Sequence, residues 1–265
     1  PVTGGPLGAT LSSADCAQVA AAIAAVGLRT PPDQCGFEPL LVKNPPAVTG
    51  RLLFEDRFAV NPTGTWSRSN GGVYGEYDPR DWQWRTDLPE GGDGGAMFAL
   101  DSLTVGNCQP GSDDQSGVMH RDSPVIAAPF GLAPPVVLVD HWLATEPGYD
   151  GGNLKVRTGA GPWRTVPAAA YRFNPYNATL VTRGSGNTNP MAGEPAFTGA
   201  DGGSFEGSWG QSQVDLRGLV RPGESFQLRF DLGVDGCNGL VGWYLDSVRV
   251  LAAEAAPRQG SVVRE

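Results

Sequence analysis

The chain has 265 residues, with 38 Gly and 23 Pro, and its formal net charge is −9. This acidity disfavours nucleic acid and anionic membranes as partners, because both attract basic surfaces. No run of about 20 apolar residues is present, so the sequence predicts no membrane insertion.

The first predicted element is a helix over residues 12–26, SSADCAQVAAAIAAV, because Ala is the strongest helix former. Ser12 and Asp15 form a variant of the capping box, and Gly27 suits the position that follows a helix. We therefore predict that residues 1–47 form a short helical appendage with a linker. No signal peptide is visible, and a start at Pro rather than Met leads us to expect a processed or excised fragment.

From Arg51 onward, short apolar runs alternate with clusters of Gly, Pro, Asn and Asp, which is typical of strands joined by turns. Eight or nine such runs predict an all-β fold, a two-sheet jelly-roll sandwich over residues 48–252, followed by a flexible tail over 253–265. The predicted strands lie within 52–58, 82–86, 95–101, 135–145, 152–158, 162–166, 211–217, 224–232 and 241–251.

Two runs show the expected packing in more detail. Phe226, Leu228 and Phe230 alternate with polar residues, so they are predicted to face the core. The period breaks in the run 241–251, which predicts either a bulge or burial on both faces. The segment 168–210 is a long stretch rich in Asn, Gly, Ser and Pro, and such a stretch is usually functional or packed on itself.

Four cysteines are present, and none forms a C-x-x-C pair. With only two His in the chain, a zinc site built from Cys and His is not expected. Of the three possible pairings we prefer Cys16–Cys35 with Cys108–Cys237. Disulfides indicate an oxidising compartment, so the sequence predicts a secreted protein.

Catalytic motifs are missing from the sequence. There is no H-E-x-x-H, no G-x-S-x-G, no phosphate-binding loop and no dinucleotide-binding loop, so we predict that the chain is not an enzyme. His141 is expected to be a packed, hydrogen-bonded histidine and His120 a surface residue. Paired carboxylates are plentiful, and they leave open a hydrolase whose carboxylate pair has no recognisable motif.

Calcium is the metal that the composition favours, because calcium binds carboxylate and carbonyl oxygens. First and last strands are often neighbours in a sandwich, so acidic residues far apart in sequence are expected to converge. The predicted ligands are Glu55, Asp56, Asp101, Asp114 and Asp246, with Asp113 beside Asp114; solvated loop carboxylates are the alternative.

Aromatic residues are more numerous than one core usually needs, and flat rings stack on sugars or peptide side chains. The alternative is that they fill the core. The predicted ligand-binding aromatics are Trp82, Trp84, Tyr176 and Trp209, within a larger group that also contains Trp66, Tyr74, Tyr77 and Trp163.

Three stretches resemble a C-terminal module of exported bacterial zinc metallopeptidases of the fungalysin and thermolysin-like kind. They are 139–157 (VDHWLATEPGYDGGNLKVR), 174–210 (FNPYNATL, then NTNPMAGEPAFTGADGGSFEGSWGQ) and 231–250 (DLGVDGCNGLVGWYLDSVRV). More weakly, residues 12–28 resemble the last helix of the peptidase domain. The zinc-binding helix of such peptidases does not occur in this chain, so no catalytic residue is carried over.

The resemblance implies a jelly-roll module similar to MAM and galactose-binding-like domains, with a structural calcium and an accessory role. It places Asp101 and Asp246 at plausible metal positions. It also marks Glu146 and Asp150-Gly151-Gly152 as a hallmark that fixes a loop. The expected partner is then a protein or glycan substrate of the parent enzyme, and a free-standing carbohydrate-binding module is the main alternative.

Overall fold

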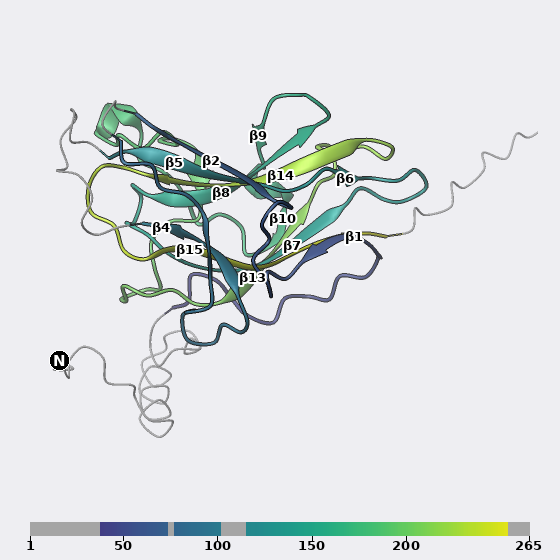
Figure 1. Cartoon of the computed structure of the whole chain (residues 1–265), viewed down its shortest axis with the longest axis horizontal. Coiled ribbons are helices and arrows are strands. Elements are labelled where there is room, and N and C mark those ends of the chain that lie inside the picture. Colours follow the sequence, from purple (N-terminus) through teal and green to yellow (C-terminus); the bar gives the residue numbers. More distant parts are fainter. Residues whose placement is uncertain (1–37, 74–76, 102–114, 254–265) are drawn as a thin grey trace, which may run out of the picture.

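The computed structural model describes residues 38–73, 77–101 and 115–253. Two antiparallel sheets pack face to face in this part of the chain, as the two layers of Figure 1 show. The predicted two-sheet jelly-roll sandwich is therefore confirmed. The predicted helix over 12–26 and the end of the tail lie outside the described residues, and no helix long and apolar enough to span a membrane occurs within them.

The first sheet holds the last long strand at its centre, and the first strand lies against it. The pairing of β1 with β15 confirms that the first and last strands are neighbours. In spatial order the sheet contains β10 (Tyr171–Phe173), β13 (Gly210–Asp215), β7 (Val136–Ala144), β15 (Gly242–Ala252), β4 (Ala96–Leu100) and β3 (Gln83–Arg85), while β1 (Arg51–Asp56) pairs with β15 beside β4.

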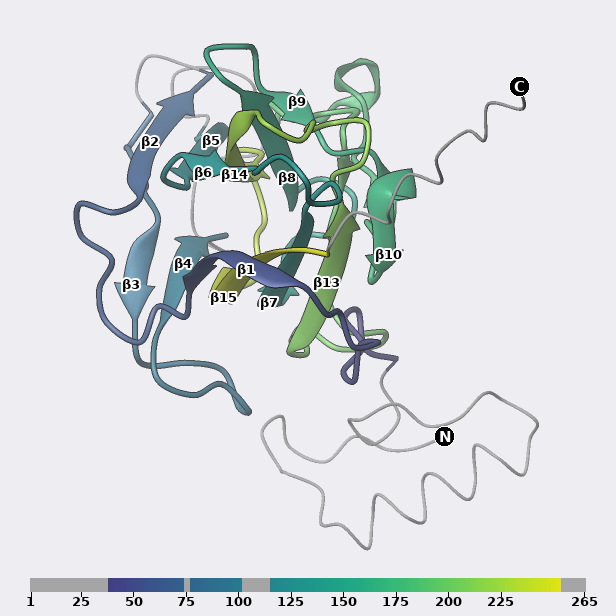
Figure 2. The ribbon, with the colours of Figure 1, turned by 90° about the vertical axis from the view of Figure 1, so that its right-hand side faces the viewer.

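The second sheet is centred on β14, and Figure 2 shows it facing the first. In spatial order it contains β2 (Ser67–Gly72), β5 (Gly117–Asp122), β14 (Ser225–Val234), β8 (Gly151–Thr158) and β9 (Arg164–Thr165), and β6 (Ile126–Ala127) also pairs with β14. A separate small hairpin joins β11 (Ala178–Thr179) to β12 (Pro195–Ala196).

The core lies between the two sheets, where alternate residues of each strand point inward. Phe226, Leu228 and Phe230 are all buried there, as their spacing predicts. Trp82 and Trp243 are the largest fully buried side chains, and their rings are 5.6 Å apart. The register of β15 shifts between Leu245 and Ser247, so the broken period in this run reflects a bulge.

All nine predicted runs contain a strand, but β2, β5, β6, β10, β11 and β12 were not predicted, and β2 and β5 are the longest of these. The sequence of β2, SRSNGG, has no apolar residue, because β2 lies at the edge of the sheet and is mostly exposed. In β5, GVMHRD, one face carries His120 and Asp122, and both form ion pairs across the sheet. Pairing with neighbouring strands, and not hydrophobic alternation, determines these two strands.

The segment 168–210 packs largely on itself and on the loop that follows β7. It contains two short 3-10 turns, η1 (Ala168–Ala170) and η2 (Arg183–Ser185), as well as β10, β11 and β12. The buried side chains of Asn187 and Asn189 both donate hydrogen bonds to the carbonyl of Tyr149, at 3.0 and 2.9 Å. The segment is thus an ordered part of the sandwich.

The stretch just before β1 is also built into the domain, although the sequence analysis assigned it to a linker. Leu41 is only 1% exposed and belongs to the main core. The Asn174 side chain bonds the backbone of Val42 twice, accepting from N at 3.1 Å and donating to O at 2.8 Å. Leu40 N donates to Asp201 at 2.8 Å. Residues from 38 onward therefore belong to the sandwich.

Candidate cation site at one end of the sandwich

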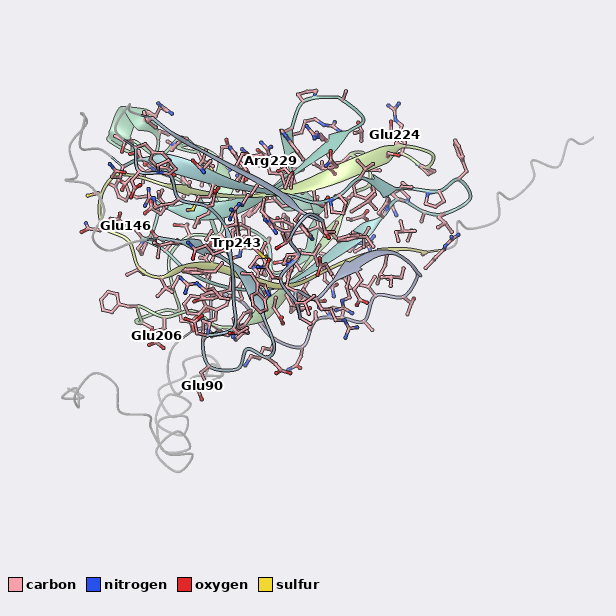
Figure 3. The ribbon with its side chains drawn as sticks, in the orientation of Figure 1. Glu90, Glu146, Glu206, Glu224, Arg229 and Trp243 are labelled. Carbon is pink, nitrogen blue, oxygen red and sulfur yellow. The ribbon has the colours of Figure 1, made fainter. Side chains whose placement is uncertain are left out.

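Acidic side chains from three loops meet at one end of the sandwich, at the left of Figure 3, where Glu146 is labelled. Asp101 follows β4, Glu146 and Asp150 lie between β7 and β8, and Asp235 follows β14. Single carboxylate oxygens of Glu146, Asp150 and Asp235 all lie within 4.8 Å of one another. We call Asp101, Glu146, Asp150 and Asp235 the acidic cluster.

Local backbone structure holds these side chains in place. A turn brings Asp150 N to 3.1 Å from Glu146 O, so both side chains are presented on one loop. Asp101 Oδ2 accepts hydrogen bonds from Glu146 N (3.0 Å) and from Leu240 N (3.1 Å). Asp150 Oδ1 accepts from Asp235 N at 2.5 Å. The three loops are thereby joined through carboxylates.

The two residues that follow Asp150, Gly151 and Gly152, lie where no side chain fits. A Cβ on Gly151 would lie 2.4 Å from Phe197 O, and a Cβ on Gly152 would lie 2.3 Å from the ring of Trp243. The Asp-Gly-Gly sequence thus places Asp150 where the small hairpin and the core meet.

Two oxygens of the acidic cluster are buried without a hydrogen-bond partner, namely Glu146 Oε2 and Asp150 Oδ2. Asp150 is fully buried and Asp101 is 1% exposed. An unpaired buried carboxylate is costly, and proteins usually compensate it with a cation or with protonation. The arrangement therefore fits a bound cation.

The pKa values of three carboxyl groups in the acidic cluster are raised above their usual range. Burial raises the pKa of Asp150 well above its usual range, and the nearby charge of Asp101 raises it further. Burial also raises the pKa of Asp101. The pKa of Glu146 rises to about 7, first through burial and then through the charges of Asp235 and Asp101. Burial is the largest cause of each shift, because it disfavours the charged form of a carboxylate.

Of the five predicted metal ligands, the structure brings only Asp101 into the cluster. Glu55 pairs with Arg57 at 2.9 Å, and Asp56 accepts hydrogen bonds from Phe58 N and Trp66 Nε1, both at 2.9 Å. Asp246 lies near Asp140 and Asp93, and burial followed by their charges raises its pKa to about 6. Asp114, with its neighbour Asp113, lies outside the described residues.

Glu146, Asp150 and Asp235 were missed as ligands, although the first two were noted as a loop hallmark. Their signal was the Glu-x-x-x-Asp-Gly-Gly spacing straight after a buried strand. Within the described ranges, Glu146, Asp150 and Asp235 are the only set of three or more His, Cys, Asp or Glu arranged to hold a metal.

The predicted ligand-binding aromatics lie in or against the hydrophobic core. Trp82 is fully buried, while Tyr176 and Trp209 are below 10% exposed. Trp84 is partly buried against the core and donates from Nε1 to Phe58 O at 2.8 Å. A ring that is covered on both faces does not stack on a ligand, so this placement favours the core-filling alternative.

The two histidines take structural positions, and Cys237 is the one cysteine within the described residues. His141 is buried, with Nδ1 3.0 Å from Trp243 Nε1 and Nε2 2.8 Å from Ser212 Oγ, as expected of a packed histidine. His120 is partly exposed and lies 2.6 Å from Asp231. Cys237 is not a free thiol; Cys16, Cys35 and Cys108 lie outside the described residues, so both disulfide pairings stay predictions.

Comparison with known proteins gives only distant likenesses. No protein-family model and no curated protein matches the chain. Among solved structures, the K3 cleaved adhesin domain of Lys-gingipain from Porphyromonas gingivalis is similar with 16% identity and a TM-score of 0.37, over 76% of this chain and 98% of that one.

Two carbohydrate-binding structures are similar at the same level. The mannan-binding module TmCBM27 shares 12% identity at a TM-score of 0.39, over 77% of this chain and 99% of its own. The CBM22 tandem domain of Paenibacillus barcinonensis Xyn10C shares 13% identity at a TM-score of 0.39, over 83% of this chain and 51% of its own. These TM-scores are too low to transfer a function.

Proposed function

We propose that this chain is a non-catalytic binding module of a secreted protein, stabilised by one calcium ion at the acidic cluster. The observation that carries the calcium proposal is the pair of buried, unpartnered oxygens, Glu146 Oε2 and Asp150 Oδ2. Two ligands of one calcium, each about 2.4 Å from the ion, are at most about 4.8 Å apart. The spacing of Glu146, Asp150 and Asp235 meets this limit.

Calcium fits the cluster better than zinc does. The donors are all carboxylates, without Cys or His, which favours a hard cation. Asp101, Glu146, Asp150 and Asp235 would hold the ion, and its charge would compensate theirs. A cation at this position joins loops and supplies no catalytic group. The carboxylates that the structure brings together are mostly buried, which also disfavours the hydrolase alternative.

A thermal melt of the purified chain tests the calcium proposal. After chelation, added calcium at about 100 times its dissociation constant is expected to stabilise the fold by about 2.7 kcal/mol. D150N should abolish this calcium-dependent rise in melting temperature. Matched controls are E55Q and D246N, which change predicted ligands outside the cluster and should keep the rise. A rise that survives D150N, or is lost in D246N, contradicts the assignment.

We further propose that the module is accessory to an exported zinc metallopeptidase, where it binds substrate or stabilises the parent. The three phrases that resemble such modules support this proposal, and the third contains Asp235 of the cluster. The test is to sequence the coding region upstream of Pro1, where an H-E-x-x-H peptidase domain is expected. A different upstream domain, or a start codon directly before Pro1, would contradict it.

Carbohydrate binding is the second candidate function. It is supported by an open polar groove at the end of the sandwich opposite the acidic cluster, near Glu224 in Figure 3. Retention of the pure chain on insoluble polysaccharides would distinguish the two: retention without any peptidase partner favours a free-standing carbohydrate-binding module.

A further inference from the structure

The groove opposite the acidic cluster lies between two turns that are bonded to each other. One is the turn between β8 and β9, and the other precedes β14. Arg164 Nη2 donates to Leu219 O at 2.8 Å, and Gly159 N donates to Ser225 O at 2.9 Å. The groove encloses about 320 Å³ and is lined by Thr158, Gly161, Pro162, Arg164, Gly218, Leu219, Arg221 and Glu224. This volume is near the lower end of the range for ligand sites, about 300–1,000 Å³.

Two arginines give this groove a local positive charge in an acidic chain. In the described part of the chain, neither Arg164 nor Arg221 forms an ion pair, whereas Arg172, Arg229 and others do. The bond to Leu219 O orients the Arg164 guanidinium and uses only one of its N–H groups. A guanidinium pairs with a carboxylate through two parallel hydrogen bonds, so the groove suits one carboxylate group.

The rest of the groove offers partners for hydroxyl groups. Thr158 carries a hydroxyl, and Glu224 Oε2 accepts a hydrogen bond from Arg221 N at 2.9 Å, which positions this carboxylate. Leu219 and Pro162 are the only apolar side chains in the lining. A ligand with many hydroxyls fits this lining better than a hydrophobic peptide segment does.

An exposed aromatic ring stands at the rim. Phe130 is 83% exposed, the most exposed of the large hydrophobic residues in the described part of the chain. Its ring lies against Gly223, between the groove residues Arg221 and Glu224, because a Cβ there would be 2.1 Å from the ring. Ala128 pairs with the same turn through bonds of 2.5 and 2.9 Å. Phe130 is therefore anchored at its base while its ring faces solvent.

We propose that this groove binds a uronic acid residue of a glycan. Arg164 and Arg221 hold the carboxylate, Thr158 and Glu224 contact ring hydroxyls, and Phe130 packs against the apolar face of the sugar. This inference rests on the proposed binding function in its carbohydrate-binding form. One carboxylate per bound residue is compatible with a net charge of −9, because Arg164 and Arg221 line the groove and form no ion pair within the described residues.

Calorimetric titration of the whole chain tests the proposal. The probes are trisaccharides of galacturonic and of glucuronic acid, their neutral methyl esters, and a tripeptide of glutamate. We expect one of the acidic trisaccharides to bind, its ester to bind at least tenfold more weakly, and the peptide not to bind. R164Q and R221Q should each weaken binding about tenfold or more, because each removes a charged hydrogen bond. F130A should weaken it several-fold.

The matched control is R183Q, since Arg183 is an exposed arginine outside the groove, and it should leave binding unchanged. Unaltered melting temperatures show that the variants are folded. Equal binding of acid and ester, or wild-type binding by R164Q and R221Q, overturns the uronate site while carbohydrate binding stands. Binding of the peptide alone replaces the sugar by an acidic peptide and overturns the proposal. If no glycan binds, the carbohydrate function fails as well, whereas the calcium melt is judged separately.

Discussion

At the scale of the residue, burial decides which side chains are charged. Trp243 Nε1 donates to Nδ1 of His141, so the ring proton sits on Nε2 and is donated to Ser212 Oγ. Ser212 in turn donates to Asn174 O at 2.9 Å. Every polar atom in this row of hydrogen bonds is satisfied while the His141 ring is neutral. Burial lowers the pKa of His141 to about 3.

The first prediction concerns pH. Because the folded pKa of His141 lies below the unfolded value near 6.5, the unfolded state takes up the proton first. The stability that depends on a neutral His141 is full above pH 6.5 and is lost as pH falls towards 3. The slope approaches roughly 1.4 kcal/mol per pH unit. The free energy of unfolding, measured with denaturant between pH 7 and 4, should become more similar in wild type and H141Q as the pH falls. Parallel curves would contradict this.

The second prediction concerns Gly152, which leaves no room for a side chain beside Trp243. Trp243 is 1% exposed and cannot move without disturbing His141. G152A should lower the free energy of unfolding by about 1–3 kcal/mol, as overpacking does. The matched control is G71A in β2, where a Cβ meets nothing within 4 Å, and its effect should stay within about 0.5 kcal/mol. Equal effects would show that the core absorbs the added methyl.

At the scale of the element, the segment before β1 illustrates how a region without secondary structure becomes part of a fold. Leu41 enters the core, and Gly210 accommodates it because a Cβ there would lie 2.7 Å from Leu41 Cβ. Gln213 donates to Pro46 O at 2.7 Å. The segment therefore packs beside β13 and is held there by side-chain hydrogen bonds.

The third prediction tests whether the segment before β1 packs on the sandwich. L41A should cost about 2–5 kcal/mol of unfolding free energy, as expected for a buried leucine. The control is L52A, because Leu52 in β1 is 49% exposed and should cost much less. Hydrogen exchange should also show protection of the Val42 amide, which Asn174 holds. If L41A and L52A lower the free energy of unfolding by equally small amounts, the sandwich domain begins near residue 48, as the composition suggested.

At the scale of the whole molecule, the acidic cluster and the groove lie at opposite ends of the sandwich. The loop after β7, which carries Glu146 and Asp150, is joined to the segment 168–210, since Gly148 N donates to Thr198 Oγ1 at 2.7 Å. The groove at the opposite end is assembled from other turns. Figure 3 shows this separation through Glu146 at one end and Glu224 at the other.

The fourth prediction follows from this separation. Chelation of calcium should increase hydrogen exchange in residues 145–150, 177–199 and 235–240, because these loops share the cluster or its hydrogen bonds. Exchange in residues 216–224 should not change. A uniform increase across the chain would contradict this local effect, because it would mean that these loops exchange only through global unfolding.

The sequence by itself determined the all-β class and nine of the strands, because alternation and turn residues are local properties. It also indicated the neighbouring first and last strands, a bulge or burial on both faces in the last strand, and a functional or self-packed segment over 168–210. For the candidate cation site it indicated only Asp101 among the ligands, and it marked Glu146 and Asp150 as a loop feature.

Only the tertiary structure decided which carboxylates meet, which aromatics are covered and that residues 40–46 pack on the sandwich. Asp101, Asp150 and Asp235 come from three loops that converge only after two sheets have paired. Trp82 and Phe130 are both aromatic in sequence, yet one is fully buried and the other is 83% exposed. Burial depends on contacts between residues distant along the chain, and local sequence patterns do not encode these contacts.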